Sequence, residues 1–398
     1  MSGVAVVGGS VAGCAAALAV GRAGAGNVTV FERTTGGLRG RGVGLGILRE
    51  LYRELADADY LDDATPHLPL STRHWITGDG RSYGGRVVGS QDFPFRSYDW
   101  GSLWQGLRDR VPDHIDYRTG CPVVSVADTG PDVVVTLADG TAERFDAVLG
   151  ADGYRSVVRA ALFPDLRPRY AGYLLWRGTL PVADLPPQQG IWAPTEAAGV
   201  TFPGGHLMMY LIPGRSGLPV LNWAVYAVPP AELAPRWDDP TSLAPGAIGV
   251  DLLDHLATLA ERMPPYWRDL LRRMPSEEIL AQPIYDLHVP ACAVGRIGLV
   301  GDAAAVARPH TGGGVAKALQ DAVTLESVLR EGMAWPDALR AYDGRRGPAN
   351  RALVEMGRAL GRATVLEPPD WRAMTPARFP QWWAEIMTQG ELGGTRLR

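Results

Sequence analysis

Lysine and cysteine are scarce in this sequence. Lys317 is the only lysine, which excludes any mechanism that needs a second one. The cysteines lie far apart and form no CxxC pair: Cys14, Cys121 and Cys292. Their spacing argues against a disulfide framework and a zinc site, and it favours a reducing cytoplasm. The sequence also has no HExxH or clustered Cys/His pattern to offer metal ligands, so we expect no metal.

Strong net charge and long apolar runs are also missing. The formal net charge is −4, so nothing electrostatic favours binding to nucleic acid or to an anionic membrane. The uncharged stretch 2–21 contains five glycines and has no basic region before its apolar run. Such a stretch suits a turn between a strand and a helix better than a signal peptide or a membrane span. We therefore expect a cytoplasmic protein that does not enter the membrane.

The composition is that of a globular protein, with 46% hydrophobic and 21% charged residues over 398 positions. Its first 32 residues are typical of a strand, a helix of small residues and a second strand. Residues 170–230 alternate apolar positions among Trp, Tyr, Pro and Gly, which predicts an antiparallel sheet. Apolar residues at helical spacing predict helices over 251–261 and 315–329.

A glycine-rich turn lies between the first strand and the helix. It follows the GxGxxG pattern of dinucleotide-binding turns, with serine where the second glycine is usual: Gly8, Gly9, Ser10, Val11, Ala12 and Gly13. Free N–H groups at the start of such a helix bind a pyrophosphate. Glu32 ends the second strand, where a carboxylate can accept the ribose hydroxyls. The pattern predicts a bound adenine dinucleotide; a purely structural tight turn is the alternative.

Two further motifs sharpen this prediction. Residues 150–159 read GADGYRSVVR and residues 298–304 read GLVGDAA. With the glycine-rich turn, in this order and at these spacings, they resemble the DG and GD motifs of the class A FAD-dependent aromatic monooxygenases, the family that includes para-hydroxybenzoate hydroxylase. The resemblance covers roughly residues 1–360. The stretches around 170–178 and 307–318 look most like the 2,6-dihydroxypyridine 3-hydroxylase branch.

The resemblance implies an α/β fold. A Rossmann-type FAD-binding domain would be interleaved with a substrate domain built on a mostly antiparallel β-sheet, followed by C-terminal helices. We expect the FAD-binding domain to comprise residues 1–72, 98–168 and 283–362. The substrate domain would comprise 73–97 and 169–282, and the C-terminal helical tail 363–398.

The resemblance also implies non-covalent FAD and NAD(P)H as co-substrate. The residues that would contact FAD are Gly8, Ser10, Val11, Ala12, Gly13, Glu32, Arg33, Arg41, Val124, Asp302, Pro309, Gly312, Gly313 and Gly314. A glycine-rich turn at a helix N-terminus can present N–H groups to a reduced, anionic flavin ring. The chain departs from the family at Trp100, where an arginine is usual, and at Ala316, where asparagine is common. The first departure puts one phosphate contact in doubt, which Arg41 or Gln105 could replace.

The implied reaction is hydroxylation of an electron-rich aromatic or N-heteroaromatic ring by O2 through a C4a-hydroperoxyflavin. For the substrate pocket we single out Trp176, Arg177, His206, Tyr210, Trp223 and Tyr226. His310 is the candidate catalytic residue, because it lies beside the flavin loop and histidine titrates near neutrality. Ordinary core packing is the competing interpretation for each of these side chains.

Three alternatives stay open on the sequence alone. The scaffold also suits a flavin-dependent halogenase or a reductase, although the WxWxIP signature of halogenases is missing. A different class would be a non-catalytic flavin-binding redox sensor. A homodimer is a further hypothesis that nothing in the sequence tests.

Overall fold

A six-stranded sheet forms one half of the molecule in the computed structural model, which describes residues 3–39, 43–187, 190–234, 243 and 246–391. Its strands, in spatial order, are β18 (Ala293–Val294), β19 (Ile297–Leu299), β12 (Ala147–Gly150), β1 (Val4–Val7), β2 (Val28–Glu32) and β8 (Asp116–Thr119). All neighbours pair in parallel except β18 and β19. β1, β2 and β12 are buried along their whole length, as apolar runs in a covered parallel sheet should be.

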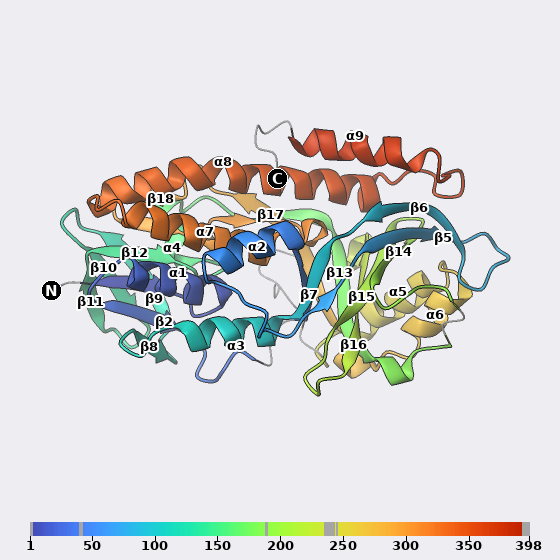
Figure 1. Cartoon of the computed structure of the whole chain (residues 1–398), viewed down its shortest axis with the longest axis horizontal. Coiled ribbons are helices and arrows are strands. Elements are labelled where there is room, and N and C mark those ends of the chain that lie inside the picture. The colour runs from blue at the N-terminus through green and yellow to red at the C-terminus, as the bar shows by residue number, and fades with distance from the viewer. Residues whose placement is uncertain (1–2, 40–42, 188–189, 235–242, 244–245, 392–398) are drawn as a thin grey trace.

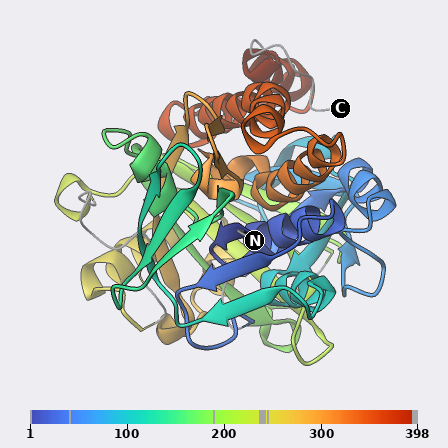
Figure 2. The ribbon, with the colours of Figure 1, turned by 90° about the vertical axis from the view of Figure 1, so that its left-hand side faces the viewer.

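Close packing explains the glycines of the first turn. Gly8 has φ +104°, a conformation that L side chains rarely adopt. A Cβ on Gly13 would lie 1.8 Å from the carbonyl oxygen of Gly8, so only glycine lets helix α1 (Val11–Arg22) begin this close to β1. Figure 2 looks onto this half, where α1 lies beside α7 (Gly314–Leu329), with α3 (Trp100–Arg110) below them.

An eight-stranded sheet forms the other half. Its strands, in order, are β20 (Ala305–Val306), β17 (Leu280–His288), β13 (Arg169–Pro181), β16 (Pro219–Ala227), β15 (Gly205–Pro213), β14 (Glu196–Phe202), β5 (Thr72–Thr77) and β6 (Arg86–Asp92). Neighbours are antiparallel except β14 and β5. Helices α5 (Val250–Ala260) and α6 (Pro265–Leu271) cover one face and share an apolar core with it. The opposite face turns toward the first half of the molecule and lines a cavity.

Smaller elements complete the fold. Two three-stranded sheets are formed by β11 (Ala142–Phe145), β10 (Val133–Leu137) and β9 (Val123–Asp128), and by β3 (Gly44–Leu48), β7 (Phe95–Asp99) and β4 (Leu68–Pro69). The short helices are α2 (Arg49–Asp57) and α4 (Val157–Leu162). The long helix α8 (Trp335–Gly361) runs along the top of both halves in Figure 1.

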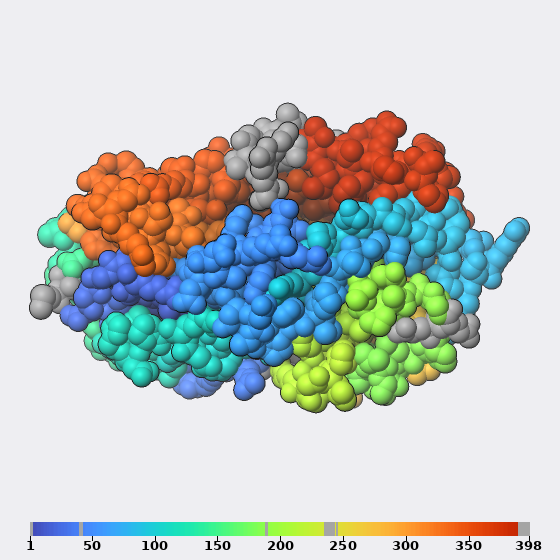
Figure 3. Space-filling view, in the orientation of Figure 1, coloured from blue at the N-terminus to red at the C-terminus, as the bar shows by residue number. Residues whose placement is uncertain are grey.

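The C-terminal segment ends as helix α9 (Phe379–Glu391), which lies over α8 and over β6 (Figure 1). Trp371, Met374 and Phe379 are buried against Trp75 and Val88 of the eight-stranded sheet. In the space-filling view the red C-terminal atoms rest directly on the light-blue atoms of the β5–β6 region (Figure 3). The predicted tail is therefore packed onto the body of the protein through aromatic residues.

The architecture confirms the predicted fold class, a mixed α/β protein with parallel and antiparallel sheets and helices near the C-terminus. No helix within the described ranges combines the length and apolar character needed to cross a membrane.

Candidate active site

The glycine-rich turn presents an uncapped helix start beside a carboxylate. Ser10 precedes α1, but its side chain makes no capping hydrogen bond, so the first N–H groups of the helix are left for another acceptor. Glu32 accepts hydrogen bonds from the backbone N–H of Gly9 at 2.8 Å and of Thr34 at 2.9 Å. These contacts fix the Glu32 carboxylate at the mouth of the turn, where a dinucleotide ribose would lie.

The DG and GD motifs are tied together by one arginine. Arg159, on α4, donates to the backbone carbonyls of Asp302 and Ala303, each at 3.2 Å, and to the carbonyl of Tyr154. Asp152 caps the start of α4 by accepting from the N–H groups of Val157 and Val158. The aspartate of the DG motif therefore caps a helix, and its arginine fixes the loop that carries Asp302.

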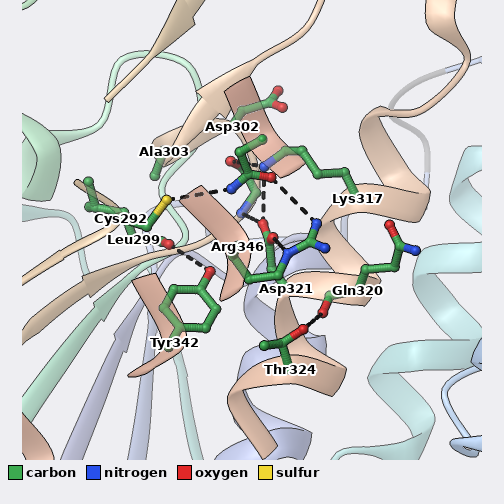
Figure 4. Close-up of polar contacts among 12 residues, drawn as sticks. Cys292, Leu299, Asp302, Ala303, Lys317, Gln320, Asp321, Thr324, Tyr342 and Arg346 are labelled. Carbon is green, nitrogen blue, oxygen red and sulfur yellow. Dashed lines mark hydrogen bonds and ion pairs between the residues drawn. The ribbon is translucent and has the colours of Figure 1, made fainter. Parts of the chain in front are cut away.

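A buried ionic network supports that loop from behind (Figure 4). Lys317 donates to the carbonyl of Gly301 at 2.7 Å and pairs with Asp321 at 3.0 Å. Asp321 also accepts from the N–H of Gly301 at 3.0 Å and pairs with Arg346 of α8 at 2.7 Å. Burial acts to raise the pKa of Asp321, but the charges of Lys317 and Arg346 outweigh it and hold the pKa below its usual value. The only lysine thus has a structural role.

The flavin-loop sequence forms a short turn that leads into α7. Pro309–Thr311 is one turn of 3₁₀ helix, and Gly312 follows with φ +62°. Gly313 precedes Gly314, the first residue of α7. Arg308 fixes the start of the turn through an ion pair with Asp286 at 2.7 Å. The loop therefore presents a glycine-rich helix N-terminus on a braced support.

A cavity of about 500 Å³ lies between this loop and the open face of the eight-stranded sheet. The loop contributes Asp302, Arg308, Pro309, His310, Thr311, Gly312, Gly313 and Gly314. The sheet contributes Arg73, Trp75, Leu175, Arg177, His206, Met208, Tyr210, Asn222, Ala224 and Tyr226. Gly44–Gly46 of β3 and Trp383 of α9 also line it. The volume suits a single-ring substrate beside a flavin.

His310 sits among aromatic side chains. Its Nε2 lies 2.8 Å from the hydroxyl oxygen of Tyr173, and its ring centroid lies 4.3 Å from that of Tyr226 and 5.5 Å from that of His206. Loss of hydration lowers the pKa of His310 well below its usual value, and the nearby charges of Arg308 and Arg73 lower it further. The expectation that His310 titrates near neutrality is therefore corrected: it is a neutral imidazole at pH 7.

Four of the six predicted substrate residues line the cavity, and two do not. Arg177, His206, Tyr210 and Tyr226 face it. Trp176 and Trp223 lie on the other face of the sheet, fully buried against α5 and α6. Successive side chains on a strand point to opposite faces, so Trp176 cannot share a face with Arg177. We therefore correct the prediction for both tryptophans, which belong to the core.

The remaining cofactor candidates lie nearer the surface. Arg33 is exposed just after β2, and Val124 on β9 is 53% exposed. Arg41 lies outside the described residues.

Comparison with known proteins places this geometry in a family. Residues 268–356 match the FAD binding domain model. The chain is 32% identical over 358 residues to 2,6-dihydroxypyridine 3-monooxygenase of Paenarthrobacter nicotinovorans, covering 86% of each chain. It is 28% identical to 6-hydroxynicotinate 3-monooxygenase of Pseudomonas fluorescens, covering 82% of each. The solved 2,6-dihydroxypyridine-3-hydroxylase of Arthrobacter nicotinovorans superposes with a TM-score of 0.82 at 28% identity, covering 94% of this chain and 96% of that one.

The chain belongs to the FAD-dependent aromatic monooxygenases.

The observed residues of this monooxygenase fit FAD. The uncapped start of α1 offers N–H groups for the pyrophosphate, and Glu32 stands beside it for the ribose. Asp302 lines the cavity, where its carboxylate would be in place to accept a hydrogen bond from the ribityl chain. The family and the cofactor expected from the three motifs are thus confirmed.

Sequence reasoning missed several residues of the monooxygenase cavity. Asn222, Arg73 and Trp75 line it and come from strands whose inward positions could have been read from the two-residue period. Tyr173 does not line the cavity but contacts His310, which does. Arg73 and Trp75 share a face because they are two residues apart on β5. Trp383 carried no usable signal, because its place depends on how the C-terminal tail folds back.

Proposed function

We propose that this monooxygenase hydroxylates a hydroxylated aromatic or N-heteroaromatic ring, with NAD(P)H as reductant and O2 as oxygen source. The observation that carries the proposal is the cavity between the flavin loop and the sheet, which is lined by aromatic side chains and holds Arg177 and a neutral His310. The related chains that are named for hydroxypyridine and hydroxynicotinate substrates support the ring chemistry.

The chain's own residues would hold FAD at both ends. The turn from Gly8 to Gly13 and Glu32 would bind the pyrophosphate and ribose, and Arg33 and Val124 would lie along the adenosine. Asp302 would accept from the ribityl chain, and the loop from Pro309 to Gly314 would lie against the ring. Bound FAD supplies the activation of O2 that no protein side chain can provide.

Arg177 would hold the anionic oxygen of the ring. Its Nη2 donates to the carbonyl of Gly44 at 3.2 Å, while its Nε has no acceptor in the described part of the chain. Charge-assisted hydrogen bonds from a guanidinium favour a deprotonated ring oxygen over a neutral hydroxyl. A deprotonated ring is also more electron-rich, which suits electrophilic oxygen transfer.

His310 would accept the proton that leaves the ring hydroxyl, and Tyr173 would orient the imidazole. Burial raises the pKa of Tyr173, so its hydroxyl stays protonated at neutral pH. The tyrosine oxygen can accept a hydrogen bond from the Nε2–H of His310, 2.8 Å away, which leaves Nδ1 of the neutral imidazole as the acceptor for the ring proton. Because burial disfavours the imidazolium, His310 would pass that proton on to solvent when the product leaves.

Substrate-stimulated turnover tests the proposal. With ring substrates such as 2,6-dihydroxypyridine, the purified protein should consume NAD(P)H and O2 and release an equivalent amount of hydroxylated product. If NAD(P)H is oxidised at the same rate with and without every ring compound, the protein is a reductase. If NAD(P)H is not oxidised at all, the protein is a flavin-binding sensor. Either result would overturn the proposal.

We also propose that the protein acts in the cytoplasm. Cys14, Cys121 and Cys292 are all free thiols, which suits a reducing compartment. A homodimer stays a hypothesis, to be tested by sedimentation of the holoenzyme.

A further inference from the structure

Arg73 is a buried cation held among aromatic rings at one wall of the cavity. It lies on β5 and is 9% exposed. Its guanidinium carbon lies 5.1 Å from the ring centroid of Trp75, 5.1 Å from Phe93 and 4.9 Å from Trp383. We call these three rings the Arg73 cage. Trp383 comes from α9, so the C-terminal segment of the chain supplies the outer ring of the cage. The same segment covers the β5–β6 region in Figure 3.

No carboxylate neutralises Arg73. Within the described residues it makes no ion pair, and its Nε has no hydrogen-bond acceptor. The other buried arginines among the described residues have hydrogen-bond acceptors: Arg308 pairs with Asp286 at 2.7 Å, Arg346 pairs with Asp321 at 2.7 Å, and Arg159 donates to backbone carbonyls. Aromatic faces attract the cation but accept few of its hydrogen bonds. A buried guanidinium without an anion is costly, so this position calls for an anionic ligand.

The groups around Arg73 exclude an internal anion. The ionisable side chains that interact electrostatically with Arg73 are Tyr226, His206 and His310, none of which is negative at neutral pH. Burial, with the charge of Arg73, lowers the pKa of His206 to about 3, so that ring is neutral. Burial raises the pKa of Tyr226, so its hydroxyl keeps its proton. Asp302 is the only acidic residue among the lining side chains, and it belongs to the FAD contacts.

We propose that Arg73 binds a carboxylate carried by the ring substrate. Arg73 thereby selects hydroxylated rings that bear a carboxylate over rings that do not. Arg177 is left to bind the ring oxygen, so the cavity recognises a substrate at two anionic points. This inference rests on the proposed function, and it narrows the substrate class from hydroxylated rings to their carboxylates.

Binding to matched ring pairs tests the assignment. The holoenzyme is titrated with 6-hydroxynicotinate against 2-hydroxypyridine and with salicylate against phenol, following the flavin absorbance. Each pair differs by one carboxylate. The wild type should bind at least one carboxylated ring about tenfold or more tighter than its partner, the range of a charge-assisted hydrogen bond. Arg73→Met should lose that preference while its affinity for the rings without a carboxylate stays within twofold.

Two further variants separate binding from folding. Arg73→Lys keeps the charge but not the fork of donors, so it should retain part of the preference. Arg22→Met is the matched control, because Arg22 also lies over a ring, Tyr60 at 5.1 Å, but has its own carboxylate partner, Asp59, outside the cavity. It should leave the preference intact. The thermal midpoint of Arg73→Met should equal or exceed that of the wild type, because an unpaired buried cation has been replaced by an apolar side chain.

Three results would overturn the inference. The first is a wild type without preference for either carboxylated ring. The second is Arg73→Met with an unchanged preference and a lowered thermal midpoint, which would make Arg73 structural. The third is a variant in which ring binding is unchanged but the KM for NADPH rises relative to NADH, which would assign the anion to the nucleotide. If the preference depends on Arg73 but no ring is hydroxylated, the proposed function fails and the binding assignment stands.

Discussion

The state of a single proton decides how His310 can work. The ring lacks hydration and lies near Arg308 and Arg73, and both effects lower the pKa of His310. A histidine with its usual pKa would be largely protonated at pH 6 and unable to accept a proton. His310 keeps its acceptor nitrogen at that pH because its pKa lies lower. It can therefore accept a proton at pH values at which an exposed histidine would already be protonated.

We predict that the yield of hydroxylated product per NAD(P)H will not fall between pH 8 and pH 6 through protonation of His310. His310→Ala should retain FAD and still be reduced, but it should lose product and release hydrogen peroxide. That loss should be partly relieved at higher pH, where the ring hydroxyl ionises without help. Product and peroxide are measured together by chromatography and a peroxidase assay. Normal hydroxylation by the variant at neutral pH would show that the proton leaves by another route.

Asp302 gives a second prediction for a single residue. Asp302→Ala should weaken FAD binding by about 1.5–3 kcal/mol, because a ribityl hydroxyl would lose its charged acceptor. Asp302→Asn keeps an acceptor oxygen and should lose less. The measurement is the dissociation constant of FAD for the reconstituted apoprotein, from the quenching of flavin fluorescence. An unchanged affinity in Asp302→Ala would show that the GD motif does not contact the cofactor.

At the level of residues, the sequence predicted motif positions better than pocket positions. The glycines form the expected turn, Glu32 lies beside it and Asp302 lines the cavity, because close backbone approach and charge restrict what can stand there; their contacts with FAD stay predictions. Trp176 and Trp223 were misassigned because large aromatic residues occur in cores as often as in pockets. The two-residue period of a strand could have separated pocket from core residues. If Arg177 faces the pocket, its neighbour Trp176 must face the other side of the sheet. The pKa of His310 depends on burial and distant charges, which no local pattern reports.

Among the elements, α7 is the one whose position the cofactor loop depends on. Lys317, Asp321 and Arg346 join α7, the GD turn and α8 in one buried network. Asp321→Asn would leave two buried cations without their counter-charge. Removing one partner of a buried pair costs about 3–5 kcal/mol.

We therefore predict that Asp321→Asn lowers the free energy of unfolding by about that amount, as measured by urea denaturation. Asp337→Asn is the matched control, since Asp337 pairs with Arg340 at 2.8 Å on the exposed side of α8. An exposed pair contributes about 0–1 kcal/mol. Equal losses in the two variants would contradict the structural role given to Lys317 and Asp321.

The contact between β6 and the C-terminal segment depends on one glycine. A Cβ on Gly89 would lie 2.0 Å from the Cγ of Phe379, too close for the ring to remain in place. Gly89→Ala should therefore release the start of α9 or destabilise the fold by about 1–3 kcal/mol, the usual cost of overpacking. Gly78→Ala is the control, since a Cβ there meets nothing within 4 Å.

Hydrogen exchange of residues 371–388 measures this prediction. Gly89→Ala should lose protection in that segment, while Gly78→Ala should match the wild type. Equal protection in all three proteins would show that Phe379 does not hold α9 against the sheet. The tail was the least predictable element from the sequence. Its short, aromatic-rich helix has its apolar partners on β5 and β6, about three hundred residues earlier in the chain.

For the whole molecule, the number of nucleotide sites restricts the catalytic cycle. The sequence contains one dinucleotide-binding turn, and in the described structure it lies between β1 and α1, at the carboxyl end of a central strand of the parallel sheet. FAD occupies that position on the family assignment. Because the sequence shows no second turn of this kind, we propose that the nicotinamide reaches the flavin transiently, through the cavity shared with the substrate.

We predict that flavin reduction by NAD(P)H is slow in the protein alone and faster when a ring substrate is bound. The purified holoenzyme should also retain no nicotinamide after gel filtration, because the reductant has no resident site. Anaerobic stopped-flow absorbance of the flavin measures the reduction rate with and without each ring. Coupling reduction to substrate keeps an enzyme with a single shared cavity from reducing O2 to peroxide when no ring is present. Rapid reduction that ignores every ring tested would instead indicate a simple reductase on the same fold.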